Sequence, residues 1–466
     1  MALVAGIDSS TQSVKIVVCE ADTGEIVRSA RAAHPAGTEV SAAKWWSAYQ
    51  EAAAAPGLLD GVQALAVGGQ QHGMVSLDAD GELVRDALLW NDNRSAPDAV
   101  DLIKELGGSQ VWADAVGSVP VASMTVSKVR WLARAEPELA ARTSAVMLPH
   151  DWLTWQLGVR GFSPVTDRGD ASGTCYFDAT KNEYRHDLVK LAFGADLDVP
   201  RVAAPSEIVG HTRDGIAIAP GTGDNMAAGL GLGINSGEAV VSLGTSGTAF
   251  TRTARQTHEP TGTVAGFADA TGGFLPLVCT LNGARNLVAT AELLGVSLET
   301  LSDLALSAPA GSEGVSFIPY LEGERTPPLP DARGELVGLT LKNMKPENIA
   351  RAAIEGVLWS LAYGVQVLRE QTGAISRITL TGGASQSRAV GPIASAVFGL
   401  PIVVTETFES VAVGAAKQAA WALTGDLPQW PVPMASEHQP SGTDESAAAA
   451  INDRYSALLQ DHFLGH

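Results

Sequence analysis

The chain has 466 residues and a formal net charge of −20, with 45% hydrophobic and 18% charged residues. Its length favours two domains over a single core, and its composition is that of a globular protein, which excludes an intrinsically disordered one. The negative charge repels phosphate backbones, so nucleic acid is not expected as a partner. A nucleotide site would therefore need local positive potential from backbone N–H groups, helix N-termini and a metal ion.

Cysteine usage and the start of the chain predict a cytoplasmic protein. The three cysteines, Cys19, Cys175 and Cys279, lack metal-ligand spacing, and such a set favours free thiols in a reducing compartment. Residues 1–7 form a short apolar run without the basic region or cleavage site of a secretory signal. No apolar stretch approaches the length that spans a bilayer, so no membrane partner is expected.

The first half of the chain is predicted to open with a strand, a loop and a second strand. Apolar and β-branched runs predict strands over residues 3–7, 14–20, 26–32, 62–67 and 74–77. Helical spacing of apolar residues predicts a helix over residues 45–55. Thr23-Gly24, between the second and third strands, is typical of a hairpin turn.

The second half opens in the same way. Strands are predicted over residues 239–243, 249–253, 273–279, 375–380 and 402–405, and an alanine-rich helix over residues 411–423. This alternation predicts the α/β class. We expect one lobe over residues 1–235 and a second over 236–427. A proline-rich linker over 428–442 and an amphipathic helix over 451–463 are expected within the remaining segment, 428–466.

Asp8 stands directly after the first strand and is followed by small polar residues, among them Thr11. Such a turn can direct several N–H groups at phosphate oxygens, and the aspartate can hold Mg²⁺ through its waters. A plain hairpin with a capping aspartate explains the same residues equally well.

A similar loop, Gly244-Thr245-Ser246-Gly247-Thr248, follows the first strand of the second half. It is not a Walker A loop, because no Gly-Lys-Ser/Thr follows. It is not a nucleophile elbow, because Thr248 stands where that motif needs glycine. Two such strand–loop–strand units, one in each half, predict two lobes that hold a nucleotide between them.

Asp224 lies where a glycine-rich loop, beginning at Gly221, becomes a helix of small residues. Phosphorylation of a sugar needs a carboxylate within hydrogen-bond reach of the attacking hydroxyl, and glycines let the sugar approach the backbone. Taken alone, a helix N-cap is the favoured interpretation of Asp224, by roughly two to one.

Three further loops carry candidate binding residues. Gln71 and His72 can bind neighbouring hydroxyls, although a lone histidine is more often structural. Trp90 can stack on the apolar face of a sugar or be buried in a core. Gly382 and Gly383 would let a base or ribose approach the backbone, but their pattern is not the G-x-G-x-x-G of dinucleotide-binding folds.

Together these motifs resemble the FGGY family of carbohydrate kinases, over about residues 6–424. One family signature is similar to residues 123–134, although Ala135 stands where a polar residue is usual. A second signature matches residues 334–355 throughout. Two long spaced patterns in the right order make a chance match an inadequate explanation.

The resemblance implies an α/β, two-lobed, actin-like (ribonuclease H-like) fold with a deep interlobe cleft, the N-terminal lobe binding sugar and the C-terminal lobe binding nucleotide. It implies Asp224 as general base and Asp8 as the residue that organises Mg²⁺. The other implied contacts are Gln71, His72, Trp90 and Asn225 to the sugar, and Thr11, Lys15, Gly244, Thr245, Gly247, Gly382, Gly383 and Gln386 to ATP.

The implied activity is ATP-dependent phosphorylation of the terminal primary hydroxyl of a small ketose, with D-xylulose favoured. Gln71 stands where family members that act on D-xylulose often carry methionine, which leaves the identity of the ketose open. The alternatives are a kinase for ribulose, a heptulose, gluconate or a polyol, and a non-catalytic actin-fold sensor of sugar or nucleotide. A homodimer is also left open.

Overall fold

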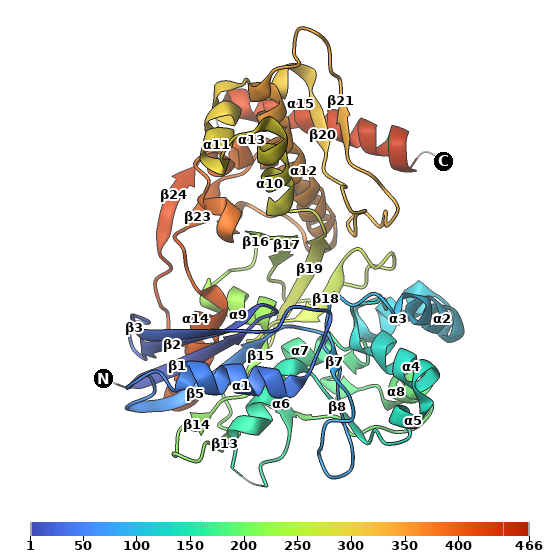
Figure 1. Cartoon of the computed structure of the whole chain (residues 1–466), viewed down its shortest axis with the longest axis vertical. Helices are drawn as coiled ribbons and strands as arrows, with labels where there is room; N and C mark the ends of the chain where they lie inside the picture. The colour runs from blue at the N-terminus through green and yellow to red at the C-terminus, as the bar shows by residue number, and fades with distance from the viewer. Residues whose placement is uncertain (1, 160, 441, 465–466) are drawn as a thin grey trace. The chain divides into compact units, whose positions relative to one another are not determined.

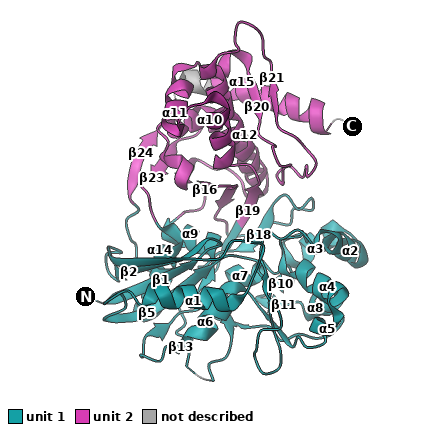
Figure 2. Cartoon of the chain, in the orientation of Figure 1, with its two compact units in different colours: residues 1–233, 254–275, 409–432 teal, residues 234–253, 276–408, 433–466 magenta. Residues whose placement is uncertain are grey.

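The computed structural model describes residues 2–159, 161–440 and 442–464. The chain forms two compact units, each assembled from three segments (Figure 2). Unit 1 consists of Met1–Gly233, Ala254–Leu275 and Glu409–Val432, and unit 2 of Ile234–Thr253, Pro276–Phe408 and Pro433–His466. The first change of unit lies two residues from the boundary expected after residue 235. The later segments that return to each unit are not visible in the local sequence pattern.

Unit 1 is built on a seven-stranded sheet (Figure 1). The strand order is β13 (Gly210–His211), β14 (Ala217–Ile218), β5 (Val62–Gly69), β1 (Leu3–Ser9), β2 (Ser13–Glu20) and β3 (Ile26–Ala33), with β15 (Thr222–Gly223) also pairing with β5. β1 runs antiparallel to β2 but parallel to β5. The expected opening of strand, loop and strand is therefore confirmed.

Two helices cover opposite faces of β1. Ala5 and Ile7 belong to a buried cluster that includes Tyr49 of α1 (Ala42–Ala53). Gly6 points to the other face, as alternate residues of a strand must, and a Cβ there would lie 1.8 Å from the backbone oxygen of Ala412. Glycine is thus required for α14 (Ser410–Thr424), the expected alanine-rich helix, to lie directly on the sheet.

Unit 2 contains most of a second seven-stranded sheet, within which β19 (Phe274–Thr280), β17 (Gly247–Thr251), β16 (Glu238–Leu243), β22 (Arg377–Thr381), β23 (Ile402–Thr405) and β24 (Met434–His438) follow one another. β16 runs antiparallel to β17 and parallel to β22. The long helix α12 (Pro346–Thr372) supplies much of the buried core, including Trp359 and Leu361.

The segment 428–442, expected as a linker, contains β24, which pairs antiparallel with β23. Its sequence, Met-Ala-Ser-Glu-His, is mostly exposed and has no β-branched residue, so strand propensity could not reveal it. The expected closing helix begins earlier than residue 451: α15 spans Gly442–Leu459 and ends in a π-helical turn over Gln460–Leu464.

The two segments that resemble family signatures have internal structural roles. Lys128, in α4 (Thr125–Ala135), is buried and donates to the backbone oxygens of Ala122, at 3.2 Å, and Ser123. Glu355, in α12, is buried and accepts from the backbone N–H of Gly311 at 2.9 Å. These residues hold loops to helices.

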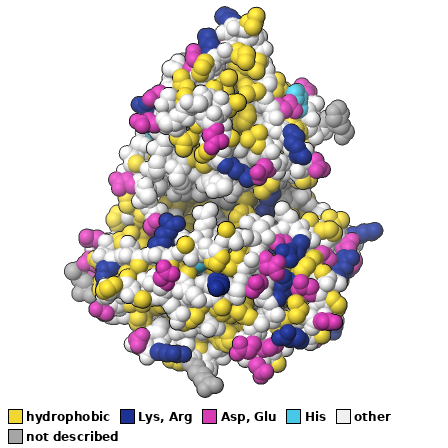
Figure 3. Space-filling view, in the orientation of Figure 1, with side chains coloured by type: hydrophobic (Ala, Val, Ile, Leu, Met, Phe, Trp, Pro, Cys, Tyr) yellow, Lys and Arg dark blue, Asp and Glu magenta, His cyan; other side chains and the backbone are white. Residues whose placement is uncertain are grey.

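On the face drawn in Figure 3, acidic and basic side chains are both present. Over α2 (Ala96–Leu106) and α4, acidic and basic side chains intermingle (Figure 3). Arg134, for example, contacts both Asp98 and Asp101 there. Among the described residues, none of the helices combines the length and the apolar character needed to cross a membrane.

Candidate active site

Three parallel strand ends gather the polar residues of unit 1. β5 lies between β1 and β15, with Asp8 and Thr222 both opposite Gly68, and Ser9 and Gly223 both opposite Gly69. Parallel strands end at one edge of a sheet, and polar groups that follow them meet there. Asp8, Gln71 and Asp224 come from these three ends and are therefore neighbours, although they are far apart in sequence.

Asp8 is buried at the end of β1 and accepts a hydrogen bond from Ser10. Burial raises the pKa of Asp8 to about 6, against the lowering effects of Ser10 and Lys15. A buried carboxyl that is short of positive charge is a suitable partner for a hydrated divalent cation, because the cation would restore the charged form.

Lys15 lies opposite Asp8 on β2, as expected for two residues on facing strands of one hairpin. Its Nζ atom is 2.6 Å from Oε2 of Glu409, with the two side chains 27% and 40% exposed. Glu409 directly precedes α14, almost four hundred residues further along the chain. Local sequence gave no signal for this contact, which neutralises a lysine that was expected beside phosphate.

Asp224 opens α9 (Asp224–Gly231) and is half-buried. Its Oδ1 atom accepts from the backbone N–H of Asn225 at 2.7 Å and from Nδ2 of Asn225 at 2.8 Å. No described residue donates a hydrogen bond to Oδ2. The N-cap residue of α9 is Gly223, so the N-cap interpretation of Asp224 is wrong by one position.

The electrostatic surroundings keep Asp224 close to its titration point near neutral pH. Burial is the largest cause, and the charges of Asp8 and Asp170 add to it, raising the pKa of Asp224 to about 7. Hydrogen bonds from Asn225 oppose the rise. A carboxyl with a pKa in this range has the basicity suited to taking a proton from a hydroxyl at neutral pH.

Gln71 and His72 lie in the loop that follows β5. Nδ2 of Asn225 also donates to Oε1 of Gln71, at 2.9 Å, which joins this loop to Asp224. His72 has the unusual φ of 65°, and its Nδ1 donates to the backbone oxygen of Gly173 at 2.8 Å. In the neutral ring, Nε2 of His72 is then an acceptor suited to a hydroxyl.

Trp90 is held by its ring nitrogen, which donates to Oγ1 of Thr11 at 2.9 Å. This contact joins two loops that were expected to serve different substrates, the sugar and ATP. It places Trp90 and Thr11 at the same end of the sheet as Asp8.

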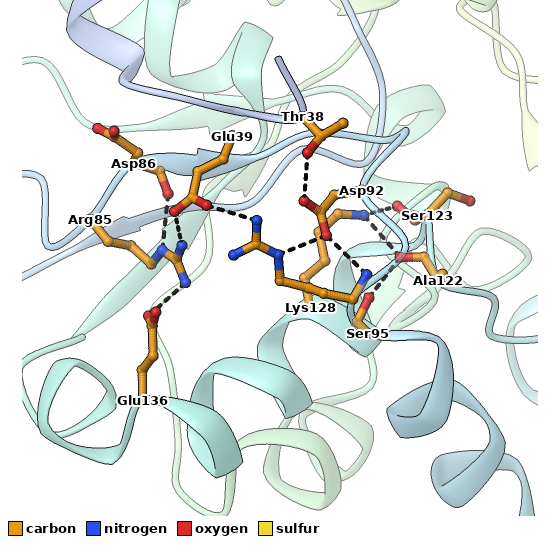
Figure 4. Close-up of polar contacts among 11 residues, drawn as sticks. Thr38, Glu39, Arg85, Asp86, Asp92, Ser95, Ala122, Ser123, Lys128 and Glu136 are labelled. Carbon is orange, nitrogen blue, oxygen red and sulfur yellow. Dashed lines mark hydrogen bonds and ion pairs between the residues drawn. The ribbon is translucent and has the colours of Figure 1, made fainter.

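A polar network supports the loop that carries Trp90 (Figure 4). Asp92 accepts from Oγ1 of Thr38 at 2.8 Å and from Nε of Arg94 at 2.9 Å. Burial raises the pKa of Asp92, but these hydrogen bonds outweigh burial and hold the pKa below its usual value. Arg94 and Arg85 both lie over the ring of Trp131, at 5.1 and 4.9 Å from its centroid.

In unit 2, the expected phosphate loop is the turn between β16 and β17, where Leu243 is paired with Gly247. The loop after β22 lies beside it. Gly382 has a φ of 93°, and a Cβ on it would lie 2.7 Å from the backbone oxygen of Leu243. Only glycine therefore allows this close approach of the two loops.

A cavity of about 730 Å³ opens next to these loops. Its walls are mainly aliphatic, with Gly244, Thr245, Gly383 and Gln386 at one side and Leu287 among the apolar lining residues. The volume and lining suit a flat apolar ring with a polar extension.

Two of the predicted nucleotide residues in unit 2 are engaged within the protein. Gly247 packs against Thr280 and Leu361 and is not among the residues that line the cavity. Gln386 does line it, but its Nε2 donates to the backbone oxygen of Thr405 at 2.9 Å, which fixes the orientation of its carboxamide.

Known protein families match this arrangement in both units. Residues 3–231 match the N-terminal domain, and residues 239–423 the C-terminal domain, of the FGGY family of carbohydrate kinases. The chain belongs to the FGGY family of carbohydrate kinases. The actin-like, two-domain fold expected from the resemblance is thus confirmed, as is the phosphotransferase class of this FGGY kinase.

Individual relatives of this FGGY kinase match over nearly their whole length. The xylulose kinase of Streptomyces rubiginosus is 43% identical over 91% of this chain and 89% of its own. The xylulose kinase of Streptomyces coelicolor is 44% identical over the same shares of the two chains. The crystal structure of xylulose kinase from Bifidobacterium adolescentis superposes with a TM-score of 0.88 at 43% identity, covering 96% of this chain and 99% of that one.

Proposed function

We propose that this kinase transfers the γ-phosphoryl group of ATP to the terminal primary hydroxyl of D-xylulose, giving D-xylulose 5-phosphate. The observation that carries the proposal is the state of Asp224. One of its oxygens is held by Asn225 and the other has no described donor, and its pKa is raised to about 7. The names of the similar proteins support D-xylulose as the acceptor.

Asp224 acts as general base in this proposal. Oδ2 accepts the proton of the attacking hydroxyl while Oδ1 stays bound to Asn225. The phosphoryl group passes through a loose transition state, so correct placement of the hydroxyl contributes as much as proton removal. His72 and Asn225 orient the sugar hydroxyls, and Trp90 packs on the apolar face of the sugar. Gln71 belongs to the same binding loop.

Asp8 fits the role of Mg²⁺ organiser, holding the ion through its waters. The ion would neutralise charge on the transferring phosphoryl group. Thr11 lies beside Asp8 and would be near the phosphates. Lys15 would reach them only on leaving Glu409, which makes its role conditional on that ion pair opening.

Unit 2 would bind the nucleotide. The backbone N–H group of Thr245 would face phosphate oxygens. Gly244 and Gly247 would shape the turn that carries it, because the Gly244 N–H donates to the backbone oxygen of Ser246 at 3.1 Å and Gly247 is paired within the sheet. Gly382 and Gly383, with Gln386, would border the ribose and base, and the aliphatic cavity beside them would take the adenine ring. This division assigns the sugar to unit 1 and most of ATP to unit 2.

Cellular context is proposed from the cysteines. Cys19, Cys175 and Cys279 are all buried and none of them forms a disulfide bond, which suits a reducing cytoplasm. The protein is accordingly proposed to act there on a free sugar, without nucleic acid or membrane. A homodimer stays a prediction.

An ATP-coupled assay over a panel of sugars tests the function. We expect kcat/KM to be highest for D-xylulose among D-xylulose, D-ribulose, a heptulose, gluconate and glycerol. A higher value for another member would replace the substrate but keep the reaction. Sugar or nucleotide binding by calorimetry, without turnover of any sugar, would favour the sensor instead.

A further inference from the structure

A group of charged side chains lies fully buried behind the candidate active site. His150, in α6 (Pro149–Leu157), and Asp170, in α7 (Arg168–Ser172), are both 0% exposed. Nδ1 of His150 is 2.6 Å from Oδ2 of Asp170. This Asp170–His150 pair touches none of the atoms assigned above to proton transfer, so its burial needs another explanation.

The surrounding carboxyl groups favour the protonated form of His150 despite its burial. Burial lowers the pKa of His150, but the nearby carboxylates of Asp151, Asp170 and Asp167 outweigh this effect and raise the pKa to about 9. Burial raises the pKa of Asp170, while His150 and Gln71 oppose the rise. Burying an ion pair is costly unless its remaining polar atoms find partners, so the free atoms of the pair are informative.

Oδ1 of Asp170 is buried and has no hydrogen bond of good geometry, and the same holds for Nε2 of Gln71. The two side chains are close enough for Gln71 to lower the pKa of Asp170. A carboxylate is an acceptor only and an amide nitrogen a donor only. Asp170 therefore dictates which end of the Gln71 carboxamide faces it.

The orientation of Gln71 determines what it offers to Asn225. With Nε2 toward Asp170, Oε1 points to Nδ2 of Asn225, at 2.9 Å. The second hydrogen of that Nδ2 goes to Oδ1 of Asp224, at 2.8 Å. A reversed Gln71 would present a donor to a donor, and Asn225 would lose the contact that aims it at Asp224.

α7 also holds the residue after Gln71. The backbone oxygen of Gly173, at the C-cap of α7, accepts from Nδ1 of His72. A Cβ on residue 173 would lie 2.7 Å from that ring nitrogen, so the contact depends on glycine. Two consecutive loop residues are thus fixed by one short helix, which the sequence did not single out.

We propose that Asp170, backed by His150, is a positioning residue that fixes the carboxamide of Gln71 and, through Asn225, aims Asp224 at the sugar hydroxyl. Gln71 is then a strut with both polar ends used inside the protein, and it does not bind the sugar directly. This inference rests on the proposed function and sharpens the part of it that concerns Gln71.

The test compares Gln71→Met, Gln71→Glu, Asp170→Asn and the double variant Gln71→Met/Asp170→Asn in the full chain, with D-xylulose and ATP. Methionine has the length of glutamine, so Gln71→Met should fold. A strut that aims a catalytic group affects turnover more than ground-state binding, so we expect kcat to fall about tenfold with KM for D-xylulose within about twofold.

The other variants test the contact between Asp170 and Gln71 separately from the contact between Gln71 and Asn225. Above neutral pH, the ionised Gln71→Glu keeps an oxygen for Asn225 but has no donor for Asp170, so its kcat should also fall. Asp170→Asn should lower kcat by a similar factor, and because it acts through Gln71 it should lower kcat by less than about threefold in the Gln71→Met background.

Asp151→Asn is the matched control. Asp151 is equally buried, and its Oδ1 is 3.3 Å from Nδ1 of His150, but no hydrogen bond to Gln71 is found among the described residues. It should lower the melting temperature as Asp170→Asn does while kcat stays within about twofold.

Several outcomes would overturn the inference. A raised KM with unchanged kcat in Gln71→Met would make Gln71 a sugar ligand. Full additivity in the double variant, or an equal loss of kcat in Asp151→Asn, would make Asp170 merely structural. If Asp170→Asn does not fold, normal turnover by Gln71→Glu is enough to reject the inference. Wild-type protein without activity on D-xylulose would instead reject the proposed function.

Discussion

The two units use the same strand arrangement to present opposite chemistry. In unit 1, β1 pairs antiparallel with β2 and parallel with β5; in unit 2, β16 pairs antiparallel with β17 and parallel with β22. The strand ends carry Asp8 and Gln71 in the first case, and Gly244 and Gly382 in the second. One topology thus supports a charged, hydrogen-bonded site in unit 1 and an open, apolar cavity in unit 2.

The two sites should therefore be sensitive to different kinds of substitution. The site in unit 1 depends on the ionisation and orientation of a few side chains, so isosteric substitutions that remove a charge should stop turnover without unfolding it. The site in unit 2 depends on backbone approach, so adding a single methyl group should disturb it.

Asp224→Asn should lower kcat by at least ~10²–10⁴, the usual contribution of general-base catalysis, while binding of D-xylulose measured by calorimetry largely survives. Asp60→Asn, an exposed carboxylate of the same unit, is the control and should behave as wild type. Near-normal turnover by Asp224→Asn would remove it from the catalytic role and leave unit 1 without its base.

The pH dependence should follow the same carboxyl. Below a pH of about 7, the value to which its pKa is raised, Asp224 holds a proton and cannot accept another, so kcat/KM for the sugar should fall as the pH is lowered through that value. A value of kcat/KM that does not change across this pH range would show that the rate does not depend on the ionisation of Asp224.

Stability should move in the opposite direction. The pKa of Asp224 is about 7 in the folded protein and 3.8 in the unfolded chain. Protonation of Asp224 therefore stabilises the folded state fully below pH 3.8, and this stabilisation is lost as the pH rises through about 7. The melting temperature of the wild-type protein should decline between pH 3.8 and about 7. In Asp224→Asn this decline should be smaller, because the contribution of Asp224 is absent. An unchanged decline would mean that other groups cause it.

Gly382→Ala should raise KM for ATP about tenfold or more, because its Cβ would meet the backbone of Leu243 and push apart the two loops beside the cavity. Gly295→Ala is the control for backbone strain, since Gly295 also has a positive φ, of 68°, but meets no atom within 4 Å. Equal effects of both variants on KM would show that strain, and not the close approach, matters.

His72→Ala should weaken ketose binding by ~1–3 kcal/mol, the usual cost of leaving buried polar partners unpaired. Measured KM values for several ketoses should rise together, with KM for ATP unchanged. If none of the ketose values moves, the role of His72 is structural, through contacts such as the one with Gly173.

Glu409→Gln should have the smallest effect. The pair with Lys15 is partly exposed, and such pairs contribute about 1 kcal/mol or less to stability. Releasing Lys15 should leave the melting temperature nearly unchanged and lower KM for ATP slightly if the lysine meets phosphate. A raised KM for ATP would assign Glu409 itself to the nucleotide site.

Local sequence predicted most of the longer strands, because apolar, β-branched runs favour strand formation, but it missed two-residue strands such as β14 and β15. The strands that begin each unit and the alanine-rich α14 are where the sequence indicated. β24 was missed because its polar, exposed sequence has no strand signal and depends on the edge of β23. Segments that return to each unit were missed because contacts, and not composition, assign them.

The sequence alone placed Asp8, Gln71 and the glycine loops of the second half after predicted strands, and Asp224 at the start of a helix of small residues. That placement follows from local pattern, since a buried strand must be followed by a turn. The tertiary structure decided their partners. Asp170 and Glu409 lie far along the chain from the groups they hold, and side-chain orientation and pKa depend on neighbours in space, which no local pattern contains.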